Sequence, residues 1–426
     1  MNRLVIKNGL IATKDEFLDV LVEDGIIKEF GHNLSIENAF VIDASGLTVL
    51  PGLVDMHCHL REPGQEYKED IASGTRSAAL GGFTTIACMP NTYPVIDNQS
   101  VANFIINKAK EVGVVKVHPI GTISKGLKGI ELSEIGELKE SGCVAISDDG
   151  KPVTSASLMK KALVYSNMFN IPVISHCEEM DLADEGVMNE GYMSTILGLK
   201  GIPSAAEDIM VARDILLSEY TGVRIHIAHV STKTSVQLIR DAKARGVKVT
   251  AETCPHYFSL TDEACENYNT MAKMNPPLRT QQDVDAVITG LCDGTIDAIA
   301  TDHAPHHADE KRCEFSLANN GIIGFETAFG LAYSLLVLRN KLTLEQLVDR
   351  MCVAPAKILG LNAGRIDLGA PADFCIVNTE KFKIVDITKF ASKSKNSPFD
   401  GYSLNGTIEF TIVDGRVVVK DGKLME

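Results

Sequence analysis

Between residues 50 and 360, short apolar runs alternate with longer amphipathic segments that carry Ala, Leu, Lys and Glu at helical spacing. Such short runs are typical of buried strands, and the longer segments are typical of helices that cover them. We expect strands at Val49–His57, Thr84–Met89, Lys116–Ile120, Cys143–Ser147, Val173–His176, Arg224–Ala228, Val247–Ala251 and Ala298–Ala300. We expect helices at Asp70–Leu80, Val101–Glu111, Ser155–Phe169, Ala205–Glu219 and Thr234–Arg245. Eight β/α units predict an α/β fold of the TIM (β/α)8 barrel type, with functional residues at the C-terminal strand ends.

The two ends of the chain have a different pattern, in which short strands with alternating apolar residues are separated by tight turns. The turn dipeptides are Asn8-Gly9, Asp24-Gly25, Asp414-Gly415 and Asp421-Gly422, all of which favour hairpins. We therefore expect residues 1–49 and 361–426 to form one small β-sandwich domain from both termini, beside a barrel domain of residues 50–360.

Two histidines at the end of the first barrel strand are the first chemical signal. Side chains alternate along a strand, so His57 and His59 face the same side and can bind one metal ion. The plain alternative is one packing and one surface histidine. Against it, metal-type ligands also follow the fourth, fifth, sixth and eighth strands, at Asp149, His176, His229 and Asp302. Six such residues at strand ends predict a binuclear metal site.

Some neighbouring residues compete for these roles. Asp148 is the rival of Asp149, because a shift of one residue turns a strand side chain to the opposite face. Cys254 is a candidate ligand, although a lone cysteine is more often structural. We expect no role for three further histidines, His32, His118 and His226.

Composition limits the kinds of partner. The chain has 426 residues and a formal charge of -15, with no basic cluster, so nucleic-acid binding is not expected. The start, MNRLVIKNGL, lacks the form of a signal peptide, and no long apolar stretch predicts a membrane span. The ten cysteines include no CxxC pair. We therefore expect a cytoplasmic protein with reduced thiols and no disulfides.

Four motifs resemble one family across essentially the whole chain. HCHLREPG at 57–64, MPNT at 89–92, NPPLR at 275–279 and TDHAPH at 301–306 are similar to the motifs of dihydroorotases of the bacterial monofunctional type, in the amidohydrolase superfamily. Arg61, directly after HxHL, separates these enzymes from hydantoinases and allantoinases. The resemblance implies a zinc-dependent, reversible cyclisation of N-carbamoyl-L-aspartate to L-dihydroorotate with loss of water, the third step of pyrimidine synthesis.

The resemblance also implies a role for each site residue. One zinc ion would be held by His57, His59, Asp149 and Asp302, and a second by Asp149, His176 and His229. Asp149 would replace the carboxylated lysine that bridges the metals in many relatives, and Asp302 would transfer the proton. Arg61, Asn91, Asn275 and His306 would bind the substrate. The resemblance leaves room for a homodimer and for association with aspartate transcarbamoylase.

Two alternatives remain open, another cyclic amidohydrolase activity (dihydropyrimidinase, hydantoinase or allantoinase) and a barrel without activity that serves as a scaffold. Two connections are longer than usual, at residues 178–203 and 303–324. We expect the second to cover the substrate and Gly321 and Gly324 to offer backbone amides to a ring carbonyl. The first is equally well explained as a surface insertion.

Overall fold

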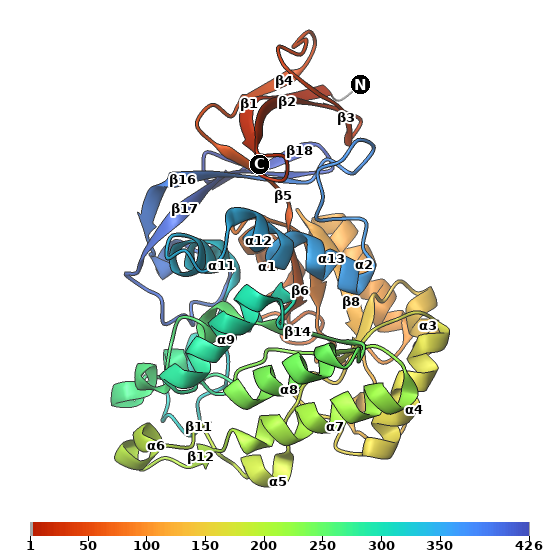
Figure 1. Cartoon of the computed structure of the whole chain (residues 1–426), viewed down its shortest axis with the longest axis vertical. Coiled ribbons are helices and arrows are strands. Elements are labelled where there is room, and N and C mark those ends of the chain that lie inside the picture. The colour runs from red at the N-terminus through yellow and green to blue at the C-terminus, as the bar shows by residue number, and fades with distance from the viewer. Residues whose placement is uncertain (1–2, 426) are drawn as a thin grey trace.

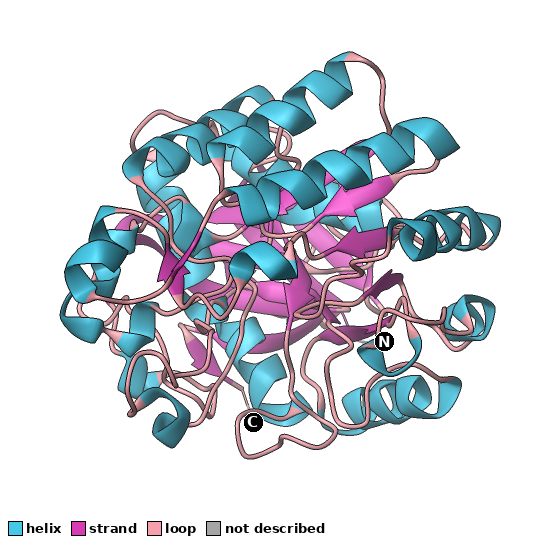
Figure 2. Ribbon diagram, turned by 90° about the horizontal axis from the view of Figure 1, so that it is seen from below, coloured by secondary structure: helices cyan, strands magenta, loops and turns pink. Residues whose placement is uncertain are grey.

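The computed structural model describes residues 3–425, and its main body is a closed barrel of parallel strands. The strands are β6 (Leu53–Cys58), β7 (Phe83–Cys88), β8 (Lys116–Gly121), β9 (Ala145–Ser147), β10 (Val173–Ser175), β13 (Ile225–Ile227), β14 (Val249–Thr253) and β15 (Ala298–Ile299), paired in that order. Closure between β15 and β6 comes from a parallel bridge of Cys58 with His303 and from the Asp302 amide, which donates to the His57 carbonyl at 2.9 Å. The predicted barrel is confirmed, with helices around the strands (Figure 2).

The predicted helices are present, with local sequence signals at their starts. The outer ring contains α1 (Ile71–Leu80), α2 (Gln99–Val112), α3 (Ile135–Glu140), α4 (Ala156–Met168), α7 (Ala205–Thr221), α8 (Lys233–Ala244), α9 (Gln281–Asp293) and α11 (Phe325–Ala332). Asp70 caps α1 and Ser155 caps α4, each by accepting a backbone amide of the first turn. Two further helices, α12 (Leu344–Val348) and α13 (Ala354–Leu359), follow α11 in the chain. Leu359, the last residue of α13, belongs to the apolar cluster inside the barrel.

The two termini meet in one nine-stranded sheet, at the top of Figure 1. Its strands are β1 (Arg3–Ile11), β2 (Glu16–Glu23), β3 (Ile26–Gly31), β4 (Phe40–Asp43), β5 (Thr48–Pro51), β16 (Phe374–Ile384), β17 (Ser403–Val413), β18 (Arg416–Lys420) and β19 (Lys423–Leu424). The N-terminal and C-terminal halves join because β5 pairs with both β1 and β16. Apolar residues of both halves share one core. The expected β domain built from both termini is therefore confirmed, and its strands belong to one nine-stranded sheet.

The first predicted strand was wrong in one respect, because Val49–His57 is two strands in two different sheets. The chain leaves the terminal sheet after β5 and enters the barrel as β6. At the junction, a Cβ atom on Gly52 would lie 2.1 Å from the Thr84 Oγ1 atom. Only glycine allows this close approach, and the apolar run gave no other sign of the break.

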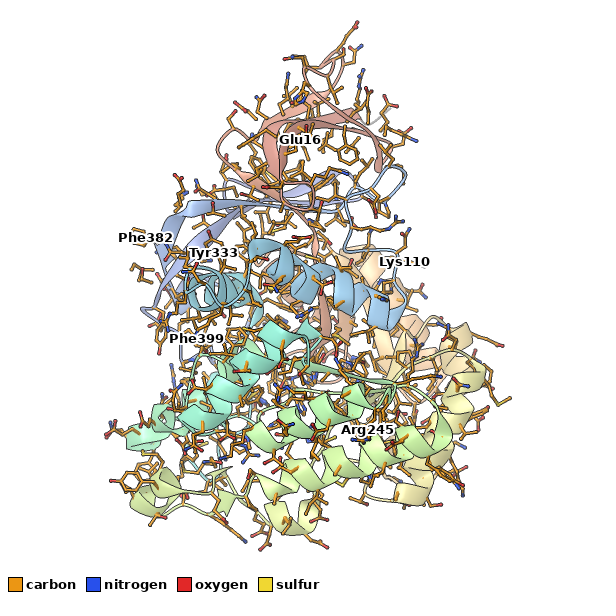
Figure 3. The ribbon with its side chains drawn as sticks, viewed as in Figure 1. Glu16, Lys110, Arg245, Tyr333, Phe382 and Phe399 are labelled. Atoms are coloured by element: carbon orange, nitrogen blue, oxygen red, sulfur yellow. The ribbon has the colours of Figure 1, made fainter. Side chains whose placement is uncertain are left out.

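Three long connections lie beyond the ends of the regular strands. Residues 178–203 contain α5 (Met180–Ala183), β11 (Met188–Asn189), α6 (Tyr192–Leu197) and β12 (Gly201–Ile202), and residues 303–324 contain α10 (Ala308–Lys311). A third connection, residues 385–402, links β16 to β17. Phe382 and Phe399, labelled in Figure 3, show that it descends from the terminal sheet to the level of the barrel. Within residues 3–425, no helix has both the length and the apolar character needed to cross a membrane.

Candidate active site

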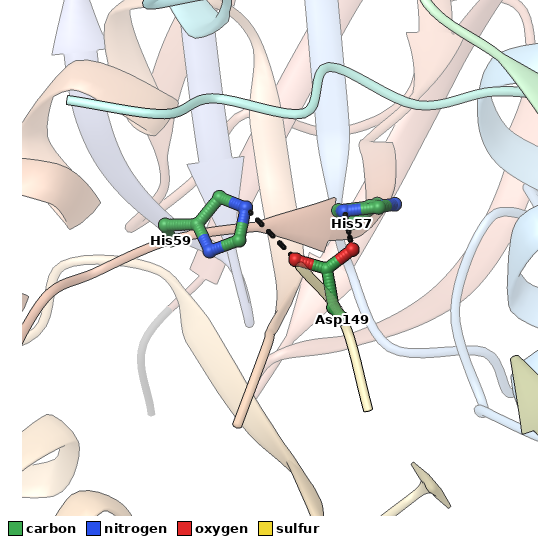
Figure 4. A group of neighbouring side chains, drawn as sticks. All are labelled: His57, His59 and Asp149. Carbon is green, nitrogen blue, oxygen red and sulfur yellow. Dashed lines mark ion pairs between the residues drawn. The ribbon is translucent and has the colours of Figure 1, made fainter. Parts of the chain in front are cut away.

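Asp149 lies at the centre of the predicted ligand cluster. Its carboxylate oxygens lie 3.4 Å from His57 Nε2, 3.5 Å from His59 Nε2, 3.6 Å from His176 Nδ1 and 3.7 Å from His229 Nε2. Figure 4 shows the first two of these contacts. His57, His59 and Asp149 form one group that can hold a metal ion, and Asp149, His176 and His229 form a second. All five side chains are buried, so the cluster is a metal-type donor set enclosed by protein.

The neighbouring Asp148 points elsewhere, although sequence reasoning left it as a rival. Its carboxylate accepts the backbone amides of Ile123 and Ser124 at 2.8 and 3.0 Å, together with the Ser124 hydroxyl. Burial would raise the pKa of Asp149, but the charge of His57 and hydrogen bonds from the surrounding imidazoles hold that pKa well below its usual value. Asp149 is therefore an anion among imidazoles, and Asp148 is occupied in a loop.

Asp302 stands beside the same histidines. Its Oδ1 atom lies 3.1 Å from His59 Nε2 and 3.5 Å from His57 Nε2. Burial opposes its ionisation, but the charges of both imidazoles outweigh this and lower the pKa of Asp302. Asp302 and His229 both have positive backbone φ angles, at 44° and 33°. Such angles are strained for residues other than glycine, and strain of this kind is concentrated at functional sites.

Arg61 and Lys68, with His306 between them, form a cationic corner of the same cavity. Arg61 is buried, has a φ of 60°, and donates from Nε to the Pro305 carbonyl at 3.1 Å. His306 donates from Nε2 to the Asn320 carbonyl at 2.8 Å, which leaves Nδ1 to accept from Lys68 Nζ at 3.3 Å. Burial and the charges of Arg61 and Lys68 lower the pKa of His306 far below its usual value. A neutral imidazole thus lies beside two cations, an arrangement suited to an anionic group.

The cavity has a volume of about 490 Å³ and brings nearly all the predicted residues together. Its lining includes His59, Arg61, Asn91, Asp149, His176, His229, Asn275, Asp302 and His306. His57 lies behind this wall, with its unpaired Nε2 atom directed at Asp149 and Asp302. Asn275 also has an unpaired, buried Oδ1 atom. Unpaired buried polar atoms are rare, and here they indicate ligands that the chain itself does not supply.

Sequence reasoning missed Glu252 and Glu178, which hold two of these histidines, and it missed the contact of the predicted Asn91 with His59. Glu252 Oε1 lies 2.5 Å from His57 Nδ1, and its Oε2 lies 3.4 Å from Nε2 of His226, the histidine for which we expected no role. Asn91 accepts from His59 Nδ1 at 2.9 Å, in addition to lining the cavity. Glu178 lies 3.5 Å from His176 Nε2. Burial lowers the pKa of His176, but the hydrogen bonds and charges of Asp149 and Glu178 outweigh burial and raise this pKa to about 10. The position of Glu252 on a barrel strand was the only signal available beforehand.

Gly321, Gly324 and Cys254 lie outside the cavity lining. The amides of Gly321 and Gly324 do not face the cavity as expected, because the first donates to the Lys273 carbonyl and the second to His303 Nδ1. Cys254 lies close to Asp302, and these two residues form a further group of possible ligands with His256. Cys254 and His256 do not line the cavity.

Comparison with known proteins agrees with this geometry. Residues 46–235 match the family model described as Dihydro-orotase-like, and residues 220–419 match the model described as Amidohydrolase family. The dihydroorotase of Acetivibrio thermocellus is 65% identical over 426 residues, which cover 99% of this chain and 100% of the relative. The chain belongs to the dihydroorotase family. The dihydroorotase of Ruminiclostridium cellulolyticum is 60% identical, over 99% of this chain and 100% of the relative.

Solved structures of other cyclic amidohydrolases share the fold of this dihydroorotase family member. The L-hydantoinase (dihydropyrimidinase) from Arthrobacter aurescens superposes with a TM-score of 0.91 at 26% identity, over 100% of this chain and 98% of that chain. A D-hydantoinase gives 0.88 at 25% identity, over 99% and 96%. Family membership and fold together make the protein a hydrolase of cyclic amides.

Proposed function

We propose that the protein is a zinc-dependent dihydroorotase that converts N-carbamoyl-L-aspartate to L-dihydroorotate and back. The observation that carries the proposal is the convergence of the metal-type cluster and the buried Arg61 on one cavity. We assign His57, His59, Asp149 and Asp302 to one zinc ion, and Asp149, His176 and His229 to the other. The donor set fits zinc, because imidazole nitrogens and carboxylate oxygens are its usual ligands at catalytic sites.

The reaction needs a nucleophile at neutral pH and a route for one proton. When bound, the zinc pair would acidify a shared water and polarise the reacting carbonyl. Asp302 takes the proton of the attacking water and delivers it to the ring nitrogen, because its carboxylate faces both the ligand cluster and the open cavity. In the cyclisation direction the ureido nitrogen bonds to the side-chain carboxyl carbon, and Asp302 accepts the proton of that nitrogen and returns it to the departing hydroxyl group, which leaves as water.

The substrate carries a carboxylate that does not react, and the cationic corner fits it. The Arg61 guanidinium is planar and can make two parallel hydrogen bonds to a carboxylate. Its Nε atom already donates to the Pro305 carbonyl, so the two terminal nitrogens remain for the substrate. His306, Asn91 and Asn275 line the same cavity and can bind the remaining polar groups of the substrate. Lys68, which lies beside His306, adds a second positive charge.

The rival activity is hydantoin or dihydropyrimidine hydrolysis, which the names of the structural neighbours suggest at 25–26% identity. A spectrophotometric assay with dihydroorotate, hydantoin and allantoin, combined with metal analysis, separates the alternatives. We expect about two zinc ions per subunit and turnover of dihydroorotate alone. Turnover of hydantoin without dihydroorotate would overturn the proposal, and an inactive protein without zinc would indicate a scaffold.

We further propose a cytoplasmic enzyme that forms a homodimer and associates with aspartate transcarbamoylase, whose product is its substrate. We also propose residues 50–360 as the barrel domain and residues 1–49 with 361–426 as the terminal domain. Sedimentation of the pure protein, alone and with aspartate transcarbamoylase, tests the assembly.

A further inference from the structure

The connection between β16 and β17 brings part of the terminal domain to the cavity wall. Residues 391–397 of this connection, here called the crossing segment, contact the loop that follows Arg61. The Ser394 hydroxyl donates to the Lys68 carbonyl at 2.7 Å, and Lys393 Nζ donates to the Glu66 carbonyl at 2.8 Å. Ser392 also donates to the buried Glu69. The terminal domain is thus connected to one side of the substrate cavity by several hydrogen bonds.

Asn396 connects the crossing segment to the other side of the cavity. It is 2% exposed, and its side chain binds three backbone groups of the 303–324 loop. Asn396 Oδ1 accepts the His306 amide at 3.1 Å, and Nδ2 donates to the carbonyls of Ala304 and Gly321 at 2.9 and 3.0 Å. Its own carbonyl accepts the Ile323 amide at 3.0 Å. Each hydrogen-bonding group of this buried amide therefore has a partner in the loop.

These bonds flank the point where Arg61 meets the loop. Ala304 and His306 are the neighbours of Pro305, whose carbonyl accepts from Arg61 Nε. Three consecutive residues are therefore each fixed by one backbone group, two of them by Asn396 and one by Arg61. At the far end of the loop, Asn396 shares the Gly321 carbonyl with Lys311, whose Nζ donates to the Asn319 and Gly321 carbonyls at 2.8 and 3.1 Å. Asn396 thus joins the end of the loop that carries His306 to the end that carries Gly321 and Ile323.

We propose that Asn396 is a positioning residue for substrate recognition, through which the terminal domain sets the affinity of the cavity for a carboxylate. It holds the backbone on both sides of Pro305, so that the Arg61 guanidinium and the His306 ring beside it keep their places at the cavity wall. The assignment of these two residues to the substrate rests on the proposed function. The other part of the proposal, that Asn396 orders the 303–324 loop, depends only on the hydrogen bonds described above.

Asn396→Ala and the similarly shaped Asn396→Asp test the proposal in the full-length protein. Both remove the donor to Ala304 and Gly321. Thr411→Val is the matched control, because Thr411 is also buried in the terminal domain but its hydroxyl donates to the Ala79 carbonyl of α1 instead of to the loop. Hydrogen exchange measured by mass spectrometry should show faster exchange of residues 303–324 in both Asn396 variants and wild-type exchange of that loop in Thr411→Val.

Steady-state kinetics with dihydroorotate provide the second measurement. We expect KM to rise about tenfold or more in the Asn396 variants, with kcat within about twofold of wild type. The reason is that hydrogen bonds to a group that does not react stabilise the bound substrate and the transition state equally. Unchanged exchange of the loop, or faster exchange with a wild-type KM, would overturn the proposal. A wild-type protein that does not turn over dihydroorotate would instead refute the proposed function, and the exchange experiment would still decide the role of Asn396 in ordering the loop.

Discussion

Glu252 and Asn91 show how single residues prepare the metal cluster. Each binds the outer nitrogen of one histidine of the first-strand pair, so that the inner Nε2 atom of each ring faces Asp149. A histidine whose Nδ1 proton is bound by an acceptor is fixed in the tautomer that ligates through Nε2. Glu252 is in turn close to His226, which gives that buried histidine a place in the same chain of contacts.

The first residue-scale prediction concerns Glu252→Gln. The amide can still accept from His57 but lacks the negative charge that makes the imidazole a better ligand. We expect zinc affinity to fall about 10–100-fold, measured by competition with a chromophoric chelator. Glu207→Gln is the control, because Glu207 is also buried but binds Ser231 and Thr232 instead of a histidine. Equal zinc affinity in wild type and Glu252→Gln would show that the contact does not tune the ligand.

The second residue-scale prediction concerns Asp302→Asn. The change keeps the shape and one oxygen but removes the base, so turnover should fall about a hundred- to ten-thousand-fold. Hydrolysis and cyclisation should fall together, because the same group transfers the proton in both directions. Zinc content should stay close to wild type, since the other ligands remain. If added zinc restored wild-type turnover, Asp302 would be only a metal ligand.

At the scale of elements, the junction between β5 and β6 divides one apolar run between two sheets. Gly52 donates its amide to the Asp373 carbonyl of the terminal domain, and the next residue, Leu53, starts the first barrel strand. The site histidines lie at the other end of that short strand. The start of the strand that carries His57 is therefore packed closely against Thr84 at Gly52.

Gly52→Ala should destabilise the protein because the new methyl group would overlap Thr84, which packs on the junction. Overpacking of this kind costs about 1–3 kcal/mol, and thermal unfolding should show a lower midpoint. Thr84→Ala in the same chain should recover part of the loss, because it removes the Oγ1 and Cγ2 atoms that lie nearest. No recovery in the double variant would mean that the strain lies in the backbone.

At the scale of the whole molecule, the contact between barrel and terminal domain contains a carboxyl group with an unusual environment. Glu326 on α11 accepts the Ser77 hydroxyl and the Ala391 amide, both at 2.8 Å. Burial raises the pKa of Glu326 to about 7, from an ordinary value of 4.5. The contact is therefore most stable when this group is protonated.

The sign of the pH effect follows from these values. Between about pH 4.5 and 7 the folded protein retains a proton that the unfolded chain has lost, so the free energy of unfolding falls as pH rises, by up to about 3 kcal/mol. Above pH 7 the effect is complete. Urea denaturation of wild type and Glu326→Gln at pH 5 and pH 8 measures this change in stability. From pH 5 to pH 8, the urea midpoint should fall more in wild type than in Glu326→Gln. Equal changes in the two proteins would place the pH dependence elsewhere.

The sequence alone predicted the barrel, a domain built from both termini and six candidate metal ligands, which the structure brings close together. These rest on local signals, since strand period, turn dipeptides and ligands at strand ends are each visible within a few residues. The preference for Asp149 over Asp148 came from motif spacing. The structure adds a physical account, because Asp148 is bound by the loop at Ile123 and Ser124.

Only the tertiary structure decided which residues support that cluster. Glu252 and His57 are 195 residues apart, and Asn396 and His306 are 90 apart. No local pattern relates such pairs, because their contact depends on barrel closure and on the path of the connection between β16 and β17. The break at Gly52 was hidden for the same reason, since the side chain that requires glycine there belongs to the next barrel strand. The residue types that we expect to bind the metals are visible in the local sequence, whereas the orientation of their side chains depends on contacts that form only when distant segments pack together.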